Sequence, residues 1–219
     1  MILNNKVEIP QIGLGTFMIE PKDAEVSVRE ALKMGYRLID TANAYVNERA
    51  VGRGIKESGV ERSEIFVSTK LWPSEYENEN AIDETLERLG LDYIDLLFLH
   101  QPAGNYIAGY KMLEKAYKEG KIKAIGISNF EGKYIEEILT KFETKPQVIQ
   151  VEAHPYYTQD ELRKTLDKYD IKLMSWYPIG HGDKKLIEEN IFKELGEKYN
   201  KTPVQIILRW HIQMGFIVI

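Results

Sequence analysis

The chain has 219 residues and a net charge of −5, from 29 lysines and arginines against 34 aspartates and glutamates. Its hydrophobic content of 43% is that of an ordinary globular protein, which excludes a disordered chain and a coiled coil. A mildly acidic protein is poorly suited to nucleic acid, because the phosphates require clustered cations. The absence of cysteine excludes a disulfide framework, thiolate catalysis and cysteine-bound metals.

The segment from Met1 to Met18 lacks the basic and then apolar stretches of a secretory signal. No apolar run approaches the roughly 18 residues that a membrane-spanning helix needs. We therefore expect a cytoplasmic protein whose partners include neither a membrane nor a nucleic acid.

Short apolar runs rich in β-branched residues alternate along the chain with amphipathic helical patterns. Gly35, Gly90 and Gly120 each follow a helical pattern, as a left-handed residue after a helix does. Thr202 and Pro203 have the residue types that begin a helix, and they precede the last helical pattern. The runs predicted as strands are 13–16, 37–40, 65–70, 94–100, 122–128, 148–152, 171–176 and 216–219.

A strand and a helix repeated at this period favour parallel pairing with right-handed crossovers. Eight such units close into a (β/α)8 barrel, whereas the alternative is an open, doubly wound sheet. No composition break or linker divides the chain, so we favour the barrel and expect residues 1–219 to form one α/β domain. The segment 6–12, with a turn at Pro10 and Gln11, is predicted to be a small β-hairpin that plugs the bottom of the barrel.

Three successive apolar runs end in Asp40, Lys70 and His100, with spacings of 70 − 40 = 30 and 100 − 70 = 30 residues. The carboxyl ends of barrel strands meet at one rim, so these side chains should converge there, together with Tyr45 from the loop after Asp40. Strands often end in polar residues because the chain leaves the core, and for any one position that explanation is the better one. An acid, a cation, an imidazole and a phenol together favour a catalytic site instead.

Two segments around these residues are distinctive. The first reads GYRLIDTA at 35–42 and continues to Tyr45, Asn47, Glu48 and Gly52, and the second reads LGLDYIDLL at 89–97 and continues to His100 and Pro102. Shorter segments also match, in the same order along the chain, at 13–16, 128–129, 150, 152 and 154–155. Together these motifs resemble the aldo-keto reductase family, including its prokaryotic members, over essentially the whole chain. The resemblance implies a barrel that binds NADP(H) and reduces the carbonyl groups of small aldehydes and ketones.

The resemblance makes Tyr45 the general acid and places Asp40, Lys70 and His100 around it. A phenol has an ordinary pKa of about 10, so a neighbouring ammonium that favours the phenolate should lower that pKa. Asp40 is expected to keep Lys70 charged and oriented. His100 is expected to hydrogen-bond the substrate oxygen.

The cofactor-binding residues also follow from the resemblance. Those implied are Thr16, Asp40, Ser128, Asn129, Gln150, Trp176, Ile179 and Gly180. Thr16 and Asp40 are expected near the nicotinamide ribose, and Ser128, Asn129 and Gln150 at the carboxamide. Trp176 is expected against the nicotinamide ring, and Ile179 and Gly180 at the pyrophosphate. Without the resemblance, Trp176 would be read as a packing residue.

The implied substrate pocket is formed by Phe17, Trp72, His100 and Gln101. The family often has tryptophan at the positions of Phe17 and Gln101. Gln101 adds a hydrogen-bond donor and acceptor to this wall, which points to polar substrates such as small oxo compounds or sugar-derived carbonyls.

Other motifs are absent or incomplete. Gly13 and Gly15 do not begin a dinucleotide fingerprint, because Met18 occupies the third glycine position. His154, His181 and His211 are too scattered for a metal site, so we predict none; we expect His154 to be structural and His211 to have no special role.

Two other functions compete with the reductase. One is a nucleotide-binding regulatory or structural protein of the same fold, which would not need an acid catalyst such as Tyr45. The other is an unrelated barrel hydrolase with paired carboxylates, for which Asp40 is the only clear acid at a strand end that faces the rim.

The sequence stops inside the predicted eighth strand, without the final helix, the 2′-phosphate-binding turn or the C-terminal loop of the family. We expect an incomplete C-terminus, an exposed apolar surface on that strand, and weak NADPH binding with poor discrimination against NADH. We expect a monomer that can associate through the uncovered strand.

Overall fold

Eight parallel strands follow one another around a barrel in the computed structural model, which describes residues 1–219. The strands are β1 (Leu14–Gly15), β2 (Leu38–Asp40), β3 (Phe66–Leu71), β4 (Leu96–Leu99), β5 (Ile125–Ser128), β6 (Val148–Glu152), β7 (Lys172–Trp176) and β8 (Ile217–Val218). The ring closes where Ile12 pairs in parallel with Val218, and the amide of Gly13 donates to the carbonyl of Val218 at 2.8 Å. The predicted α/β barrel is confirmed.

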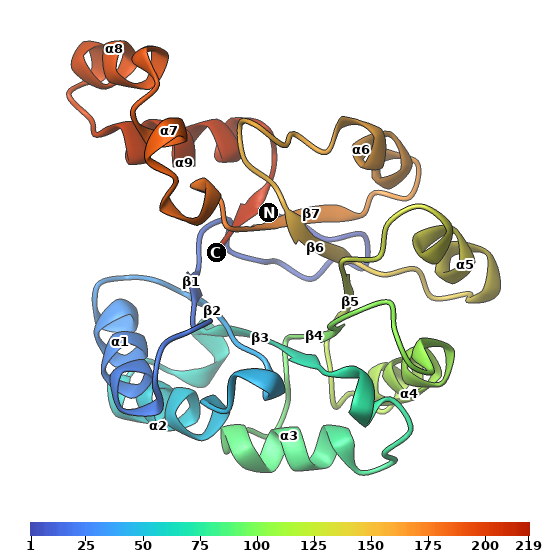
Figure 1. Ribbon diagram of the computed structural model, residues 1–219. Coiled ribbons are helices and arrows are strands. Elements are labelled where there is room, and N and C mark those ends of the chain that lie inside the picture. The colour runs from blue at the N-terminus through green and yellow to red at the C-terminus, as the bar shows by residue number, and fades with distance from the viewer.

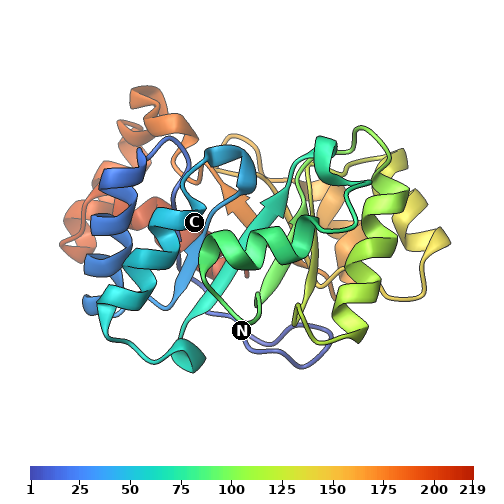
Figure 2. The ribbon, with the colours of Figure 1, turned by 90° about the horizontal axis from the view of Figure 1, so that it is seen from below.

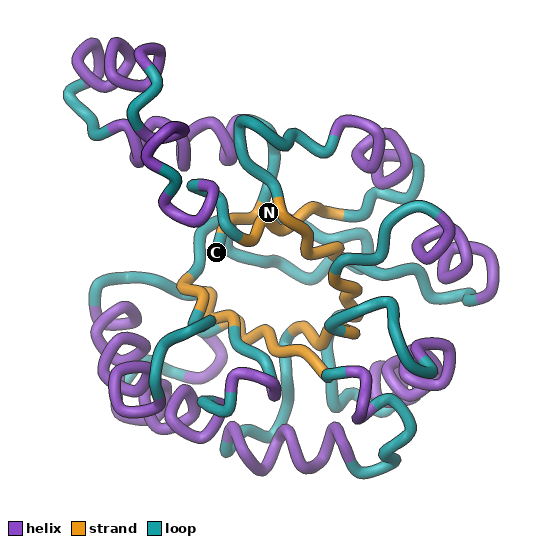
Figure 3. The backbone as a smooth tube through the Cα atoms, viewed as in Figure 1, coloured by secondary structure: helices purple, strands orange, loops and turns teal.

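The helices surround the strands as an outer layer (Figure 1 and Figure 3). They are α1 (Pro21–Lys33), α2 (Glu48–Ser58), α3 (Ala81–Leu89), α4 (Tyr106–Lys118), α5 (Lys133–Lys141), α6 (Asp160–Asp167), α7 (Lys184–Ile187), α8 (Asn190–Tyr199) and α9 (Pro203–Gln213). Gly35, Gly90 and Gly120 have φ angles of 103°, 64° and 77°, so the predicted left-handed helix ends are confirmed. Thr202 caps α9 in a reciprocal arrangement with Gln205, also as its residue type indicates.

Most differences from the predicted strands occur where a strand begins. Ile94 and Ile122 form only an isolated bridge with one another, so β4 and β5 begin later than expected. At the other end, β3 continues one residue past Lys70, and His100 lies directly after β4. The carboxyl ends of the strands therefore still bring Asp40, Lys70 and His100 to one rim.

The barrel interior has an apolar core of its own below this rim. It contains one or two side chains from most strands, and Leu3 and Ile9 of the N-terminal segment pack into it. Figure 2 shows this segment passing beneath the barrel, at the end away from the rim. A larger core fills the space between the strands and the helices.

The N-terminal hairpin lies earlier in the chain than predicted. Ile2 pairs with Glu8 in an antiparallel bridge, and Asn4 and Asn5 form the turn. The expected turn at Pro10 and Gln11 is wrong, because the carbonyl of Gln11 accepts from Val218 and so joins this segment to the barrel. The predicted function of the hairpin as a plug agrees with the position of its apolar side chains.

The eighth strand is buried, against expectation. Phe216 packs against Trp210 of α9, Ile217 lies in the core inside the barrel, and Val218 is also buried. The exposed residue is instead Ile12, the pairing partner of Val218, which is about half exposed. The expected apolar surface on this strand is therefore wrong.

Gly52 explains how closely α2 packs on its neighbour. A Cβ atom at this position would lie 2.0 Å from the carbonyl oxygen of Leu89 in α3, which no side chain tolerates. The glycine thus allows the two helices to pack closely, and it holds α2 in place directly after the loop that carries Tyr45.

No helix of the protein is both long and apolar enough to span a membrane.

We predict that Ile9→Ala destabilises the protein by about 2–4 kcal/mol, because it leaves a cavity where the hairpin plugs the barrel. Ile9 is fully buried (0%), whereas Ile2 in the same hairpin is 61% exposed, so Ile2→Ala is the matched control. Unfolding in urea measures both variants. Equal effects of the two substitutions would show that the hairpin does not act as a plug.

Candidate active site

A cavity of about 1010 Å³ opens at the carboxyl ends of the strands. Most of the residues predicted from the sequence line it: Phe17, Asp40, Tyr45, Trp72, His100, Gln101, Ser128, Asn129, Gln150, Trp176 and Ile179. Thr16, Lys70 and Gly180 are buried and do not line it. The structure therefore brings the predicted residues to one mouth of the barrel, with three of them behind its surface.

An ion pair between Lys70 and Asp40 lies at the base of this cavity. The Lys70 Nζ donates to Asp40 Oδ2 at 2.5 Å, and the two residues are 0% and 1% exposed. Burial by itself lowers the pKa of Lys70, but the charge of Asp40 opposes this and the net pKa is raised. The stabilisation that comes from the raised pKa of Lys70 is therefore fully present at neutral pH and is lost as the pH rises above the ordinary lysine pKa of about 10.4.

Hydrogen bonds to neutral groups complete this pair. Ser68 Oγ and Gln150 Nε2 donate to Asp40 Oδ1 at 2.7 Å and 3.1 Å. Lys70 Nζ also donates to the carbonyl of Thr41 at 2.8 Å. Ser68 was not predicted as a site residue, although its register opposite Asp40 follows from pairing the two apolar runs.

Tyr45 lies above the ion pair, at the end of a short 3-10 helix (Asn43–Tyr45). The Lys70 Nζ is 5.0 Å from the centre of its ring, and the rings of Phe17 and His100 lie 5.0 Å and 5.8 Å away. Burial raises the pKa of Tyr45, and the charge of Lys70 opposes this without reversing it. The expectation of a lowered pKa is therefore wrong for the protein alone, because desolvation of the phenolate outweighs the nearby ammonium.

Asn47 fixes the loop that carries Tyr45. Its amide nitrogen donates to the carbonyls of Thr16 and Ile19, at 2.9 Å and 3.1 Å, and its amide oxygen accepts from Thr41 Oγ1 at 2.7 Å. These bonds join the segments after β1 and β2 at the edge of the mouth. Asn47 belongs to the recognised motif, but the sequence alone assigned it no task.

Glu48 anchors the same loop from the next position. Its buried carboxylate accepts from Thr69 Oγ1 of β3 and from Arg88 Nε of α3, both at 2.6 Å. Thr69 precedes Lys70, so this bond joins the loop of Tyr45 to the strand that carries its neighbouring cation. The backbone segments that carry Tyr45 and Lys70 are thereby held together.

His100 is largely buried at the wall of the cavity, with its ring edge-on to Trp72 at 5.0 Å. Burial and the charge of Lys70 lower the pKa of His100 to about 3. The imidazole is therefore neutral at physiological pH. Its Nδ1 is buried without a partner, whereas its Nε2 is not enclosed and makes no hydrogen bond within the protein. A neutral ring of this kind offers one hydrogen bond to a ligand in the cavity.

Polar side chains from β5 to β7 form the opposite wall. Asn129 Oδ1 accepts from Trp176 Nε1 at 3.1 Å, and Asn129 Nδ2 donates to the carbonyl of His100 at 3.4 Å. Ser128 and Gln150 lie beside them and line the cavity. An indole ring next to hydroxyl and amide groups fits the flat, amide-bearing ring of a nicotinamide, so the donor set suits the implied cofactor.

The loop after β7 supplies two aromatic residues that the sequence did not single out for the site. Tyr177 and His181 both line the cavity and stack on one another. The ring of Tyr177 also lies 6.2 Å from that of Phe17, on the loop after β1. The only sequence signal for the contact between Tyr177 and Phe17 was that Tyr177 is aromatic and directly follows Trp176.

Gln101 has a firmly held backbone and a side chain that lines the cavity. Its amide donates to the hydroxyl of Tyr76 at 3.0 Å, and that hydroxyl donates to the Gln101 carbonyl at 2.8 Å. No hydrogen bond within the protein uses the side-chain amide of Gln101, which is therefore available to a ligand in the cavity that Phe17 and Trp72 also line.

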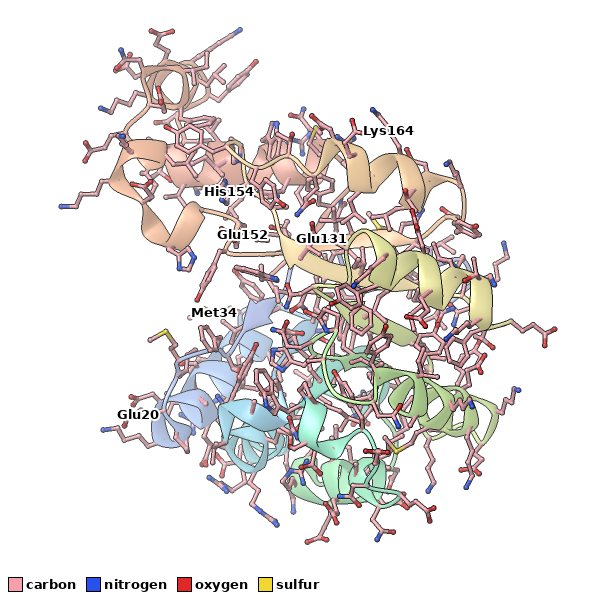
Figure 4. All side chains as sticks on the ribbon, turned by 45° about the vertical axis from the view of Figure 1, so that its right-hand side comes forward. Glu20, Met34, Glu131, Glu152, His154 and Lys164 are labelled. Atoms are coloured by element: carbon pink, nitrogen blue, oxygen red, sulfur yellow. The ribbon has the colours of Figure 1, made fainter.

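Elsewhere, His154 pairs with Glu152 at 3.2 Å, as expected of a structural residue, and Figure 4 shows the two side by side at the end of β6. A second cavity, of about 690 Å³, is lined by 12 residues near the first turns of α5 and α6, four of them acidic, and contains none of the predicted site residues. No group of three or more histidine, aspartate or glutamate side chains has a geometry that could hold a metal ion.

Comparison with known proteins gives a consistent result. Residues 11–219 match the model of the aldo/keto reductase family. Glyoxal reductase of Bacillus subtilis is 46% identical over 222 residues, which cover 99% of this chain and 80% of that protein. Methylglyoxal reductase DkgA of Escherichia coli (strain K12) is 36% identical, over 96% of this chain and 78% of that protein.

Two solved structures have the same fold over the whole chain. An aldo/keto reductase from Brucella melitensis is 42% identical, with a TM-score of 0.95 over 100% of this chain and 86% of the other. The aldo-keto reductase MGS-M4, from a Medee basin deep-sea metagenome library, is 41% identical, with a TM-score of 0.97 over 100% of this chain and 83% of the other.

We predict that Asp40→Asn lowers the free energy of unfolding by about 3–5 kcal/mol, because it leaves the Lys70 ammonium buried without a counter-charge. The double variant Asp40→Asn/Lys70→Met removes that charge and should recover much of the loss. Unfolding in urea at neutral pH measures all variants. Asp170→Asn, which breaks an exposed pair with Lys172, is the control and should cost less than about 1 kcal/mol. A double variant no more stable than Asp40→Asn would contradict this interpretation.

Proposed function

Because this chain belongs to the aldo/keto reductase family, we propose that it reduces small aldehydes and ketones to alcohols with NADPH, using Tyr45 as the proton donor. The observation that carries the proposal is the position of Tyr45 in the mouth of the barrel. The phenol lies within reach of both the buried Lys70–Asp40 pair and the neutral His100. A protein that only bound nucleotides would have no use for this arrangement.

Reduction of a carbonyl group needs a hydride at carbon and a proton at oxygen. A bound reduced nicotinamide supplies the hydride, and the protein has to supply the proton as negative charge develops on the oxygen. Tyr45 is protonated at physiological pH, because its pKa is raised above the ordinary value. Tyr45 lines the cavity and its hydroxyl donates no hydrogen bond within the protein, so it is available to donate to the substrate oxygen.

Lys70 makes this donation easier. The ammonium stabilises the phenolate that remains after proton transfer, and it acts strongly because water does not screen it in the buried position. Asp40 holds the ammonium charged and directed, since its carboxylate offsets the cost of burying the cation. The pair therefore acts through Tyr45 and need not touch the substrate.

His100 has a different task. With a pKa of about 3 it stays neutral, so it acts as a hydrogen-bond donor to the substrate oxygen and not as a second acid. Because its ring lies 5.8 Å from that of Tyr45, a hydrogen bond from His100 would hold the substrate oxygen near the phenol. Binding by two groups sets the face of the carbonyl that is open to hydride.

The cofactor would lie against the opposite wall. Ser128, Asn129 and Gln150 would hydrogen-bond the carboxamide, and the indole of Trp176 would stack on the ring. Ile179 and Gly180, on the loop after β7, would face the pyrophosphate, with Thr16 and Asp40 near the ribose. We assign NADPH because this form is general in the family.

The pocket wall favours small substrates with a second oxygen. Phe17 and Trp72 are aromatic, while the free amide of Gln101 lines the same cavity and offers a hydrogen bond. Among the relatives, the glyoxal and methylglyoxal reductases carry 2-oxoaldehydes in their names. We therefore propose 2-oxoaldehydes as a substrate class for this chain.

We predict that Tyr45→Phe lowers turnover of methylglyoxal by about 10²–10⁴-fold, the usual contribution of a general acid, and leaves NADPH binding nearly unchanged. The reason is that the hydroxyl acts on the substrate oxygen alone. Loss of absorbance of reduced nicotinamide measures turnover, and quenching of tryptophan fluorescence measures cofactor binding.

Tyr177→Phe is the matched control, because it removes a phenol oxygen from the same cavity at a position without a proposed chemical role. Its turnover should stay near that of the unchanged protein. An equal loss in the two variants, or a loss of cofactor affinity in Tyr45→Phe, would show that Tyr45 is a binding residue. A parent protein without activity on any aldehyde would contradict the proposed function itself.

A further inference from the structure

The loop that follows β7 is folded into a conformation of low intrinsic stability. Four of the residues in the segment 177–182 have positive φ angles: Tyr177 (49°), Gly180 (59°), His181 (58°) and Gly182 (74°). Two of the four are not glycine, and each such residue costs free energy in this region. A segment of this kind keeps its shape only where surrounding contacts impose it.

His211 of α9 makes the contact that reaches the middle of this loop. Its Nε2 lies 2.8 Å from the carbonyl oxygen of Pro178, and the residue is 0% exposed. No other group of the protein donates to that carbonyl. A carbonyl only accepts, so the imidazole carries its proton on Nε2 and donates it to Pro178.

The protonation state of His211 agrees with this geometry. Burial lowers the pKa of His211 to about 4, and the bond to Pro178 opposes this only in part. The ring is therefore neutral at physiological pH and has a single N–H to give. Its Nδ1 has no partner, so the bond to Pro178 is the ring's only hydrogen bond.

The face of α9 that carries His211 makes a second contact with the loop. Ile207 lies four residues earlier, which places it one turn away on the same side of the helix. It forms a small apolar core with Leu186 and Phe192, and Ile179 of the loop packs against this core. One helix thus supports two successive loop residues, Pro178 by a hydrogen bond and Ile179 by apolar packing.

We propose that His211 is a positioning residue: by donating to the Pro178 carbonyl it holds the 177–182 loop in the shape that the cofactor side of the mouth requires. The proposal differs from the expectation, from the sequence, that His211 has no special role. His211 does not line the cavity, so it acts only through the loop. The part of the inference that concerns cofactor binding rests on the proposed function, whereas the part that concerns the loop does not.

Amide hydrogen exchange in the protein without cofactor tests the effect on the loop. The amides of Gly180, Gly182 and Asp183 donate to carbonyls within the loop, at 2.8 Å, 3.1 Å and 2.8 Å, so their exchange reports its shape. His211→Leu should raise their exchange by about tenfold, as expected when one hydrogen bond is lost. His211→Gln places an N–H near the position of Nε2 and should restore slow exchange.

Trp210→Leu is the control for a general weakening of α9. Trp210 packs against the larger core and lies edge-on to the His211 ring at 4.8 Å, but its side chain makes no hydrogen bond to the loop. Trp210→Leu should lower thermal stability without a selective effect on the amides of Gly180, Gly182 and Asp183. If His211→Leu does not fold, His211→Phe keeps the ring volume without the donor and should give the same result. Unchanged exchange in the donor-free variant, or equal exchange in His211→Leu and His211→Gln, would overturn the proposal.

Cofactor titration tests the second part. His211→Leu should raise the dissociation constant for NADPH, measured by tryptophan fluorescence, by about tenfold, while turnover at saturating NADPH changes little and His211→Gln behaves like the parent. Faster loop exchange with unchanged NADPH affinity would overturn the link between the loop and the cofactor. A parent protein that binds no NADPH would overturn the proposed function, and the exchange experiment would still decide the role of His211.

Discussion

The buried ion pair of Lys70 and Asp40 is the constraint on which the rest of the site depends. Two charges out of contact with water are costly, and their attraction offsets the cost only when hydrogen bonds satisfy the remaining atoms. Here those bonds come from different parts of the barrel. Ser68 lies on the neighbouring strand, and Gln150 reaches Asp40 from β6, across the barrel interior. The pair therefore requires the strands to close in one register, and the closed barrel in turn keeps water from the pair.

The same pair divides the mouth into two chemical halves. On the side of β2 to β4, the loop of Tyr45 is fastened by Asn47 and Glu48, which leaves the phenol above the ammonium and beside His100. On the side of β5 to β7, hydroxyl, amide and indole groups form a neutral wall. In the proposed function, proton donation belongs to the first half and binding of the nicotinamide ring to the second. Asp40 contacts both halves, through Lys70 and through Gln150.

Much of this arrangement could be predicted from the sequence. The regular alternation of strands and helices indicated the barrel, and equal spacing brought Asp40, Lys70 and His100 to one rim. The hairpin was misplaced because Pro10-Gln11 and Asn4-Asn5 are both good turn formers, and local pattern does not say which one the barrel bottom accepts. The pKa of Tyr45 was misjudged for a related reason: the balance between burial and a nearby charge depends on depth, which no motif reports. His211 looked like any helical residue, since its partner is a carbonyl far away in the chain.

The central claim is that Lys70 acts on the reaction through the phenol of Tyr45. The pH dependence of single-turnover reduction of methylglyoxal, with saturating NADPH, tests it most directly in the parent protein and in Lys70→Met. Reduction needs the protonated phenol, so the rate falls as the pH rises through the apparent pKa of the coupled Tyr45–Lys70 pair. Without the Lys70 ammonium the phenolate of Tyr45 is less stable, so the pKa of Tyr45 rises. The account predicts a slower reaction in Lys70→Met whose alkaline limb lies at higher pH. A slower reaction with the alkaline limb unmoved would contradict it.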